Sequence, residues 1–411
     1  MSLEPATAVG QSALPTTRQT EEDLILVVDD TKANRDILRI LLKREGYAIV
    51  EAADGREALE ILERDDPDLV LLDIMMPGID GFEVCERIKS NPATKDLPVI
   101  FLSALTQTEQ KVKGLDLGAA DYVTKPFDKS EVKARVRTHL ELRRLNLSLA
   151  AANEVLRRQK EELDAELADA AIIQRSLLPA PSYSEKGLSV EWCIEPCASL
   201  GGDFVNIVPL AGKQVAIYLG DVSGHGVPSS LITMTVDRAL TDDRALADAD
   251  GVPRQPAEVL ENLDSSYSAR ELEKHVTMFY CVVDLASWQV GYSSAAHPAA
   301  VLVRDGQVVS THEEGGSVIG IGGMIPFDDA VLQMQPGDRL VAYTDGVTEN
   351  QAPDGSFYGE ERFYEFLARH ARTPTAEVAP ILLEELRVHR QDQPPQDDIS
   401  IVILERETGN E

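Results

Sequence analysis

Long apolar runs and positive charge are both scarce in this sequence. Among 411 residues, 39 Lys and Arg stand against 70 Asp and Glu, which gives a formal net charge of -31. An acidic surface repels nucleic acid and anionic lipid, so neither is expected as the main partner. A membrane-spanning helix needs about 20 consecutive apolar residues, and no stretch approaches that length. Glu4 also stands where a signal peptide would need an apolar core. The sequence therefore predicts a cytoplasmic protein without a membrane partner.

Cysteine is also rare. The four cysteines occur singly, without C-x-x-C spacing, at Cys85, Cys193, Cys197 and Cys281. Zinc sites normally take their thiolates from closely spaced pairs. We therefore expect reduced cysteines that serve packing.

The first third of the chain alternates apolar runs with amphipathic helical patterns. Residues 1–22 are rich in Ala, Ser, Thr and Pro without periodicity, and we expect a disordered leader there. From residue 23 to about residue 139, continuous apolar strands alternate with helices. This pattern indicates a doubly wound α/β domain with a parallel, flavodoxin-like sheet. Functional residues are then expected at the carboxyl ends of the strands.

Residues 140–178 read as one long helix. The stretch contains neither Gly nor Pro, and small or apolar residues recur at intervals of seven, at Leu142, Leu149, Leu156, Leu163, Ala170 and Leu177. A stripe of this period is typical of a coiled coil, and it predicts a parallel homodimer. The alternative is a solitary helix that packs on its own domain.

Residues 179–411 change to short β runs separated by turns, with helical patterns between them. Strands clustered on either side of paired helices predict an α+β sandwich. The whole chain is thus expected to hold two folded domains joined by a long coiled-coil helix.

The N-terminal candidate site consists of polar residues that follow the predicted strands. Asp29 and Asp30 close the first strand, Asp73 closes the third, and Ser103 and Lys125 follow the fourth and fifth. Three clustered carboxylates repel one another unless they hold a divalent cation. One of them could then accept a phosphoryl group whose oxygens bind Lys125 and Ser103.

These residues lie in motifs that resemble the receiver domain of two-component response regulators. The motifs are Val28-Asp29-Asp30, Leu72-Asp73-Ile74-Met75-Met76-Pro77-Gly78, Leu102-Ser103-Ala104 and Thr124-Lys125-Pro126-Phe127. The resemblance implies that a sensor histidine kinase phosphorylates Asp73 and that Asp29, Asp30, Asp73 and the Met75 carbonyl bind Mg2+. It also implies that Ser103 and Tyr122 form a conformational switch. The alternative is a degenerate receiver that never takes phosphate.

The C-terminal candidate site rests on four scattered aspartates, Asp203, Asp221, Asp345 and Asp397, each beside a small residue and a strand-like run. Two divalent ions about 3.5–4 Å apart can activate water for attack on phosphorus. Such a pair needs one bridging carboxylate, and Asp221, inside a Gly/Ser turn, is the best candidate. The Gly-Gly-Asp-Phe motif at Asp203 could suggest a cyclic-dinucleotide synthase, but Asn206 follows where that activity would want an acid.

Taken in order, the C-terminal motifs resemble the metal-dependent serine/threonine protein phosphatases, in the bacterial branch of the sporulation stage II E phosphatase and the phosphatases of sigma-factor regulation. The motifs are Gln174-Arg175-Ser176-Leu177-Leu178-Pro179, Gly201-Gly202-Asp203-Phe204, Gly220-Asp221-Val222-Ser223-Gly224-His225-Gly226, Ala295-Ala296-His297-Pro298, Tyr343-Thr344-Asp345-Gly346-Val347-Thr348-Glu349 and Asp397-Asp398-Ile399-Ser400.

The resemblance implies two Mn2+ or Mg2+ ions bridged by Asp221. Asp203 and the Val222 carbonyl would complete one coordination shell, and Asp345 with Asp397 would hold the other ion. Asp398 matches a position that is often Asn and ranks below Asp397.

Two residues depart from the phosphatase pattern, since Ala296 replaces the usual Gly before His and Asn206 replaces a frequent Asp. His225 and His297 lie between small residues and are interpreted as structural rather than as acid catalysts.

The sequence thus predicts a response regulator whose phosphorylation on Asp73 controls a phosphoserine/phosphothreonine phosphatase. The expected substrate is a phosphorylated anti-sigma-factor antagonist. A pseudo-phosphatase that binds and sequesters a regulatory protein is the main alternative. A DNA-binding output is disfavoured by the acidic balance.

Overall fold

The structure, a computed structural model, describes residues 22–103, 108–241, 243–248, 252–267, 274–322 and 325–408. The predicted leader lies outside these residues, apart from Glu22. The chain divides into two compact units between Lys160 and Glu161. This division falls inside helix α5 (Lys129–Leu177).

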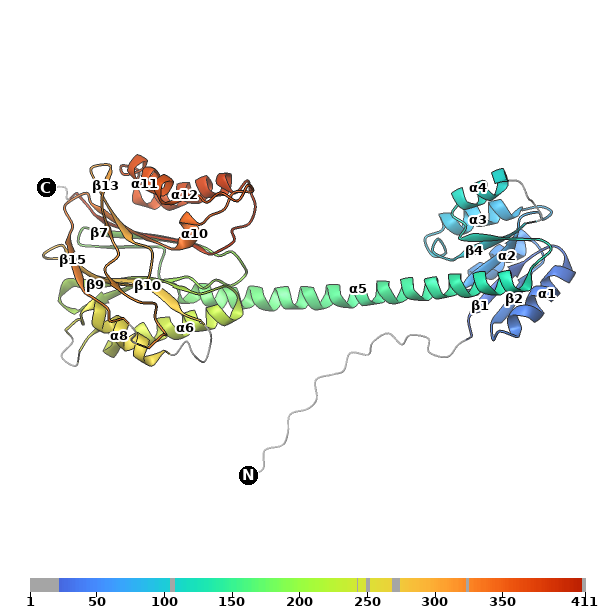
Figure 1. Ribbon diagram of the computed structural model, residues 1–411, viewed down its shortest axis with the longest axis horizontal. Coiled ribbons are helices and arrows are strands. Elements are labelled where there is room, and N and C mark those ends of the chain that lie inside the picture. The colour runs from blue at the N-terminus through green and yellow to red at the C-terminus, as the bar shows by residue number, and fades with distance from the viewer. Residues whose placement is uncertain are drawn as a thin grey trace, which may run out of the picture. The chain divides into compact units, whose positions relative to one another are not determined.

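The first unit is a five-stranded parallel sheet in the order β2-β1-β3-β4-β5 (Figure 1). Its strands are β1 (Leu24–Val28), β2 (Ala48–Ala52), β3 (Leu69–Asp73), β4 (Val99–Ser103) and β5 (Asp121–Thr124). Its helices are α1 (Lys32–Lys43), α2 (Gly55–Arg64), α3 (Gly81–Ser90), α4 (Thr108–Asp116) and the first turns of α5. A separate apolar core lies on each face of the sheet, which confirms the doubly wound prediction.

The carboxyl end of β3 is packed tightly against the start of α3. A Cβ added to Gly81 would lie 2.2 Å from the Asp73 carbonyl oxygen, so only glycine fits there. The Gly81 N–H donates to the Ile74 carbonyl at 3.0 Å. This close approach fixes the backbone that carries Asp73.

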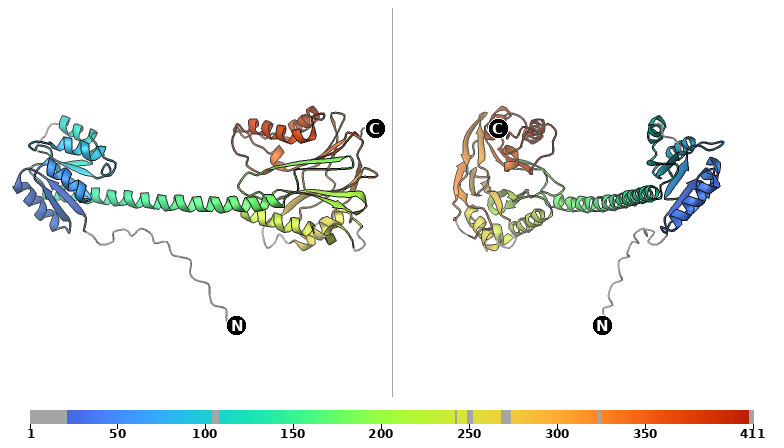
Figure 2. Two further views of the ribbon diagram at one scale, coloured as in Figure 1. Left: turned by 180° about the vertical axis from the view of Figure 1, so that it is seen from behind. Right: turned by 45° about the vertical axis from the view of Figure 1, so that its right-hand side comes forward.

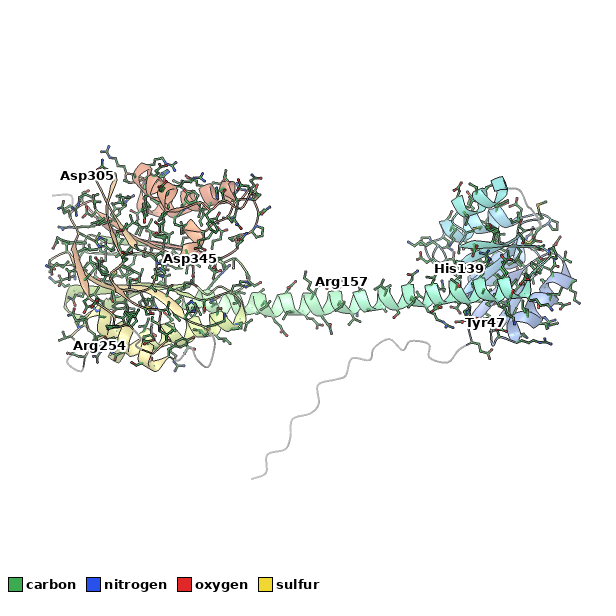
Figure 3. The ribbon with its side chains drawn as sticks, in the orientation of Figure 1. Tyr47, His139, Arg157, Arg254, Asp305 and Asp345 are labelled. Carbon is green, nitrogen blue, oxygen red and sulfur yellow. The ribbon has the colours of Figure 1, made fainter. Side chains whose placement is uncertain are left out.

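Helix α5 is 49 residues long, and the burial of its apolar side chains differs along its length. Its first turns bury Val132, Val136 and Leu140 in the core of the first unit. Farther along, its apolar side chains are exposed, and Leu156 keeps 62% of its accessible surface. The middle of the helix carries local ion pairs, in which Glu154 contacts Arg157 and Arg158; Figure 3 labels Arg157 on this stretch. The predicted long helix is confirmed, and it is continuous with the last helix of the first unit, which begins at Lys129.

No helix among the described residues is both long and apolar enough to cross a membrane.

The second unit contains two stacked sheets. One has the order β14-β11-β10-β9-β8, with β15 paired to β11, and the other has the order β13-β12-β16-β17-β7-β6. The first sheet is built from β8 (Phe204–Leu210), β9 (Gln214–Val222), β10 (Val276–Asp284), β11 (Gln289–Ala295), β14 (Gly315–Gly316) and β15 (Ala330–Gln333). The second is built from β6 (Ser182–Glu185), β7 (Leu188–Glu195), β12 (Ala300–Arg304), β13 (Gln307–His312), β16 (Arg339–Tyr343) and β17 (Ile399–Arg406).

Helices cover the outer faces of both sheets (Figures 1 and 2). The helices and short turns of this unit are η1 (Ala211–Lys213), α6 (Val227–Leu240), α7 (Asp243–Leu246), α8 (Pro256–Ser266), α10 (Asp345–Thr348), α11 (Glu360–Arg369) and α12 (Thr375–His389). α6 and α8 pack on the β8–β11 side, whereas α11 and α12 pack on the β12–β17 side. A third apolar core fills the space between the sheets. This arrangement confirms the α+β sandwich.

The strand pairing of the second unit brings the four predicted aspartates to neighbouring strand ends. Asp203 directly precedes β8, and Asp221 lies next to the last residue of β9. Phe204 pairs with Gly220, so these two carboxylates are close neighbours in one sheet. Asp345 and Asp397 flank β16 and β17, which are also paired. Each sheet therefore contributes two of the four carboxylates.

Candidate functional site

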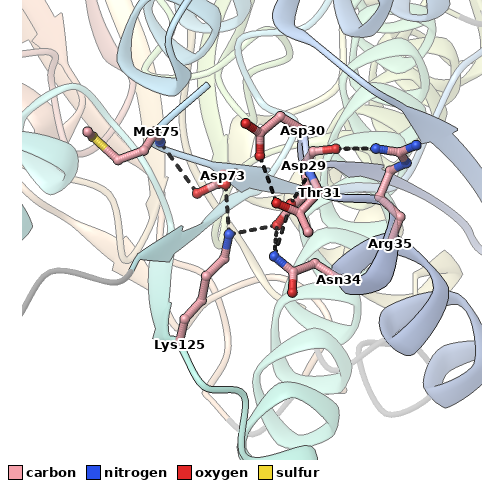
Figure 4. Close-up of polar contacts among 8 residues, drawn as sticks. All are labelled: Asp29, Asp30, Thr31, Asn34, Arg35, Asp73, Met75 and Lys125. Carbon is pink, nitrogen blue, oxygen red and sulfur yellow. Dashed lines mark hydrogen bonds and ion pairs between the residues drawn. The ribbon is translucent and has the colours of Figure 1, made fainter. Parts of the chain in front are cut away.

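The first cluster forms at the carboxyl edge of the parallel sheet. Asp29, Asp30 and Asp73 each offer an oxygen within 4.8 Å of the others. Lys125 Nζ donates to both Asp29 Oδ2 and Asp73 Oδ2 at 2.7 Å (Figure 4). Asp29 and Asp73 are buried, while Asp30 is exposed. The structure thus brings together three carboxylates and one cation from three segments: the loop after β1, the end of β3 and the loop after β5.

Two residues on α1 hold Asp29 in place and were not identified from the sequence. Asn34 Nδ2 donates to both carboxylate oxygens of Asp29 at 3.0 and 3.1 Å, and Arg35 donates to its carbonyl at 2.6 Å. Their only signal in the sequence is their place in the first turn of the helix that follows the paired aspartates.

The remaining predicted residues lie around Asp73. The Met75 N–H donates to Asp73 Oδ1 at 3.4 Å, so the backbone after β3 curls back over the carboxylate. Ser103 ends β4 and Tyr122 lies in β5, and both line one small cavity with Ile74 and Phe101.

At both Asp73 and Lys125, burial and the ion pair between them shift the pKa in opposite directions. Burial raises the pKa of Asp73, and the ion pair with Lys125 only partly offsets that rise. Burial alone would lower the pKa of Lys125, but its hydrogen bonds to Asp29 and Asp73 outweigh burial and raise it. The lysine therefore stays charged, and one cation serves two buried carboxylates. This donor set of hard oxygens with an excess of negative charge fits Mg2+.

The second cluster forms where the two sheets of the second unit meet. Asp203 is buried, and its Oδ2 accepts from Thr344 Oγ1 at 2.9 Å and from Ser400 Oγ. Its side chain also hydrogen bonds to Asp221. Asp345 opens α10 directly after β16 (Figure 3).

Burial and the neighbouring carboxylates raise the pKa values of Asp203, Asp221 and Asp345. Burial, followed by repulsion from Asp345 and Asp397, raises the pKa of Asp221 to about 7. Burial and the charge of Asp221 raise the pKa of Asp203 well above its ordinary value. The pKa of Asp345 rises as well, through burial and then Asp397. A divalent cation would remove this mutual repulsion, so the cluster fits hard metal ions.

Asp397 and Asp398 are adjacent in sequence but differ in their surroundings. Asp398 is buried, and its two oxygens accept the backbone N–H groups of Cys197 at 2.8 Å, Gly202 at 2.6 Å and Asp203 at 3.3 Å. Asp397 is exposed, and its Oδ1 accepts the Asp398 N–H at 2.8 Å. Asp398 therefore anchors the loop before β8, a role that the sequence alone did not reveal.

Two family models match the chain. The response regulator receiver domain matches residues 25–137, and stage II sporulation protein E (SpoIIE) matches residues 211–407. The first range contains the whole Asp73 cluster. The second contains Asp221, Asp345 and Asp397 and begins after Asp203. The chain thus joins a receiver domain to a SpoIIE-type domain.

Curated relatives match the receiver domain. The probable transcriptional regulator ycf27 of Porphyridium aerugineum is 44% identical over 120 residues, which are 29% of this chain and 49% of the relative. The DNA-binding dual master transcriptional regulator RpaA of Synechocystis sp. is 45% identical over 116 residues, which are 28% of this chain and 48% of the relative. The chain thus spans about half the length of these relatives.

A solved structure matches the SpoIIE-type domain. The SiaA-PP2C domain of Pseudomonas aeruginosa is 26% identical, with a TM-score of 0.52, and the match covers 60% of this chain and 98% of that domain. Because nearly all of the solved domain is matched, the second unit has its fold.

His297 of the SpoIIE-type domain is a structural residue. It is buried, its Nδ1 lies 3.0 Å from Thr277 Oγ1, and burial lowers its pKa to about 3. A histidine this hard to protonate stays neutral near pH 7 and cannot serve as an acid there. His225, by contrast, is exposed in the loop after Asp221.

Ala296, which departs from the family pattern, has a positive φ of 48°. Glycine adopts this left-handed conformation without strain, whereas an L-residue costs about 1–2 kcal/mol. The turn before His297 therefore keeps the glycine conformation although the glycine is missing.

The contrast between Asp397 and Asp398 gives a stability prediction. Asp398→Ala leaves three backbone N–H groups without their acceptor, two of them in buried and one in a partly buried hydrogen bond. We expect the free energy of unfolding of the second unit to fall by about 2–4 kcal/mol. Asp397→Ala is the matched control, and we expect a change of less than about 0.5 kcal/mol because the side chain is exposed. Urea unfolding of the full chain without divalent ions measures both. Equal losses in the two variants would contradict the assignment of Asp398 as the anchor.

Proposed function

We propose that this protein is a response regulator in which phosphorylation of Asp73 controls a metal-dependent phosphoserine/phosphothreonine protein phosphatase. The observation that carries the proposal is the convergence of four carboxylates from two sheets, with the pKa of Asp221 raised to about 7. The SpoIIE match supports this assignment. The proposed boundaries are 23–139 for the receiver, 140–178 for the linker and 179–411 for the phosphatase.

In the proposed phosphatase site, Asp221 would bridge two Mn2+ or Mg2+ ions. Asp203 and the Val222 carbonyl would hold one ion, and Asp345 with Asp397 would hold the other. Bound metal ions supply a nucleophilic water and neutralise the phosphoryl oxygens. Thr344 and Ser400 orient Asp203 through their hydroxyl groups. The reaction breaks the phosphorus–oxygen bond and releases a serine or threonine hydroxyl.

In the proposed receiver site, Asp73 accepts a phosphoryl group from a sensor histidine kinase. Lys125 already contacts Asp73 and would remain beside the phosphoryl oxygens. Asp29, Asp30, Asp73 and the Met75 carbonyl would hold Mg2+, and Ser103 with Tyr122 would respond as the switch. Ser103 and Tyr122 line the same small cavity beside Ile74.

The proposed substrate is a phosphorylated anti-sigma-factor antagonist. Its support is the resemblance of the C-terminal motifs to the phosphatases of sigma-factor regulation. The cytoplasmic location of the protein remains a prediction of its sequence.

We also propose that α5 pairs with a second copy in a parallel coiled coil. Its apolar stripe is exposed along the helix, at Leu142, Leu145, Leu149, Leu156, Leu163, Ile173 and Leu177. A stripe of this length on one helix favours a partner, because water contact with apolar side chains is unfavourable.

The metal assignment predicts that Asp221→Asn abolishes turnover. Loss of the bridging charge removes several kcal/mol of transition-state stabilisation, so Mn2+-dependent hydrolysis of p-nitrophenyl phosphate should fall about a thousandfold. Asp354→Asn is the matched control, since Asp354 is an exposed turn residue that bonds only locally to Ser356. A wild-type chain that hydrolyses neither this ester nor any phosphoprotein would support the pseudo-phosphatase instead.

The receiver assignment predicts that acetyl phosphate with Mg2+ adds one phosphoryl group to the wild-type chain and none to Asp73→Asn. Intact-protein mass spectrometry measures the addition. The phosphatase rate should change on phosphorylation in the wild type and in Asp66→Asn, an exposed control, but not in Asp73→Asn. An equal response in Asp73→Asn would show that control does not pass through this residue.

The coiled-coil assignment predicts that Leu156→Lys weakens self-association, because it places a charge in the centre of the apolar stripe. Ala168→Lys, at an exposed position off the stripe, should leave association unchanged. Sedimentation equilibrium of the full chain measures both. A wild-type monomer at micromolar concentration would exclude the coiled coil.

A further inference from the structure

Lys274 lies two residues before β10, at the end of the sheet where Asp221 lies. In the pairing of β9 with β10, Thr277 is opposite Asp221 and Val276 is opposite Val222. The Val222 carbonyl is a proposed metal ligand, and Lys274 precedes its partner by two residues. The strand register therefore places this lysine beside the turn that follows Asp221.

The Lys274 side chain folds over this turn. Its Nζ donates to the Ser223 carbonyl at 2.6 Å. A Cβ added to Gly224 would lie 3.0 Å from Nζ, and Gly224 has a positive φ of 77°. Glycine thus lets the turn and the ammonium approach each other. Lys274 is partly exposed, and one of its three N–H groups serves the bond to Ser223. A positive charge therefore lies at the solvent edge of the turn.

The turn keeps its position through other contacts as well. The Ser223 N–H donates to the His275 carbonyl at 3.0 Å, and the His275 N–H donates to Ser223 Oγ at 3.1 Å. Ser229 Oγ, in the first turn of α6, lies 3.4 Å from the Ser223 carbonyl oxygen that Lys274 binds. These contacts extend the pairing of β9 with β10 and hold Ser223 from two elements. The feature that Lys274 adds to the turn is its charge.

The charge of the substrate gives this ammonium a role. The aspartates of the second cluster carry four negative charges when they are ionised, and two divalent cations would balance them. A phosphoserine or phosphothreonine group brings a further charge of about -1.5 to -2 at pH 7. The chain as a whole has a formal net charge of -31 and repels such an anion. A lysine ammonium binds phosphate as a compact point charge, so Lys274 offsets this repulsion at the site.

We propose that Lys274 is a substrate-binding residue whose ammonium contacts the phosphoryl oxygens of the phosphoserine or phosphothreonine at the second cluster. The inference rests on the proposed function and deepens it, since it takes Asp221 and the Val222 carbonyl as metal ligands. The released phosphate ion has the same oxygens and would make the same contact. Binding that is equal in the ground state and the transition state affects KM and leaves kcat unchanged.

Two substitutions separate the charge of Lys274 from its hydrogen bond. Lys274→Gln removes the charge but keeps an N–H group that can donate to the Ser223 carbonyl, whereas Lys274→Arg keeps the charge. Lys213→Gln is the matched control. It removes the same charge from an exposed lysine directly before β9, at the other end of that strand.

Calorimetric titration of the Mn2+-loaded full chain with inorganic phosphate is the main measurement. We expect Lys274→Gln to weaken phosphate binding about 10-fold, because a hydrogen bond between charged groups is lost. Lys274→Arg should stay within about threefold of the wild type, because the charge remains. Lys213→Gln should bind phosphate as the wild type does. Titration with Mn2+ should give the wild-type affinity in all three variants, since Lys274 is no metal ligand.

Hydrolysis of p-nitrophenyl phosphate assigns the binding to the phosphatase site rather than to the receiver domain. In Lys274→Gln, KM and the inhibition constant of phosphate should both rise about 10-fold, while kcat stays within about threefold of the wild type.

Wild-type phosphate affinity in Lys274→Gln would overturn the inference, because the lysine would then only hold the turn. An equal loss of Mn2+ affinity in Lys274→Gln would also overturn it, since the effect would then pass through the metal ligands. An equal loss of phosphate affinity in Lys213→Gln would show that only the net charge matters. A failure of the proposed function looks different, because the wild type itself would then hydrolyse no phosphate ester.

Discussion

Crowding of buried carboxylates is the constraint on which both halves of this protein depend. In each unit, strand ends bring several aspartates so close together that burial and mutual repulsion raise their pKa values, as at Asp73 and Asp221. Such an arrangement costs folding free energy unless a cation shares the site. In the receiver domain, Lys125 supplies one positive charge of the chain itself. In the SpoIIE-type domain, burial and the neighbouring carboxylates raise the pKa values of Asp203 and Asp221.

The scaffold around each cluster keeps the carboxylates from moving apart. Asn34 and Arg35 hold Asp29 from the adjoining helix, and Gly81 lets α3 approach the backbone of Asp73. In the other domain, the Asp398 carboxylate accepts hydrogen bonds from three backbone N–H groups of the segment before β8 and so holds that segment in place. In both domains, these contacts fix the backbone and keep the carboxylates close together. A bound metal ion would reduce the repulsion between them.

Helix α5 belongs to the core of one domain and to the metal-site surroundings of the other. Its first turns bury Val132 and Val136 under the receiver sheet, and its last turn holds Gly201 through Gln174. Between them the chain contains neither Gly nor Pro, the residues that most often interrupt a helix.

The sequence by itself determined the two fold classes, the long helix and the identity of the carboxylates. Local patterns suffice for these, because strand-like runs, a seven-residue repeat and acidic residues at strand ends are all visible in neighbouring positions. Only the tertiary structure decided which of Asp397 and Asp398 anchors a loop, that Asn34 holds Asp29, and that Gln174 contacts Gly201. Those roles depend on contacts between residues as far as 201 positions apart, and no local pattern records which distant N–H group a carboxylate or an amide will meet.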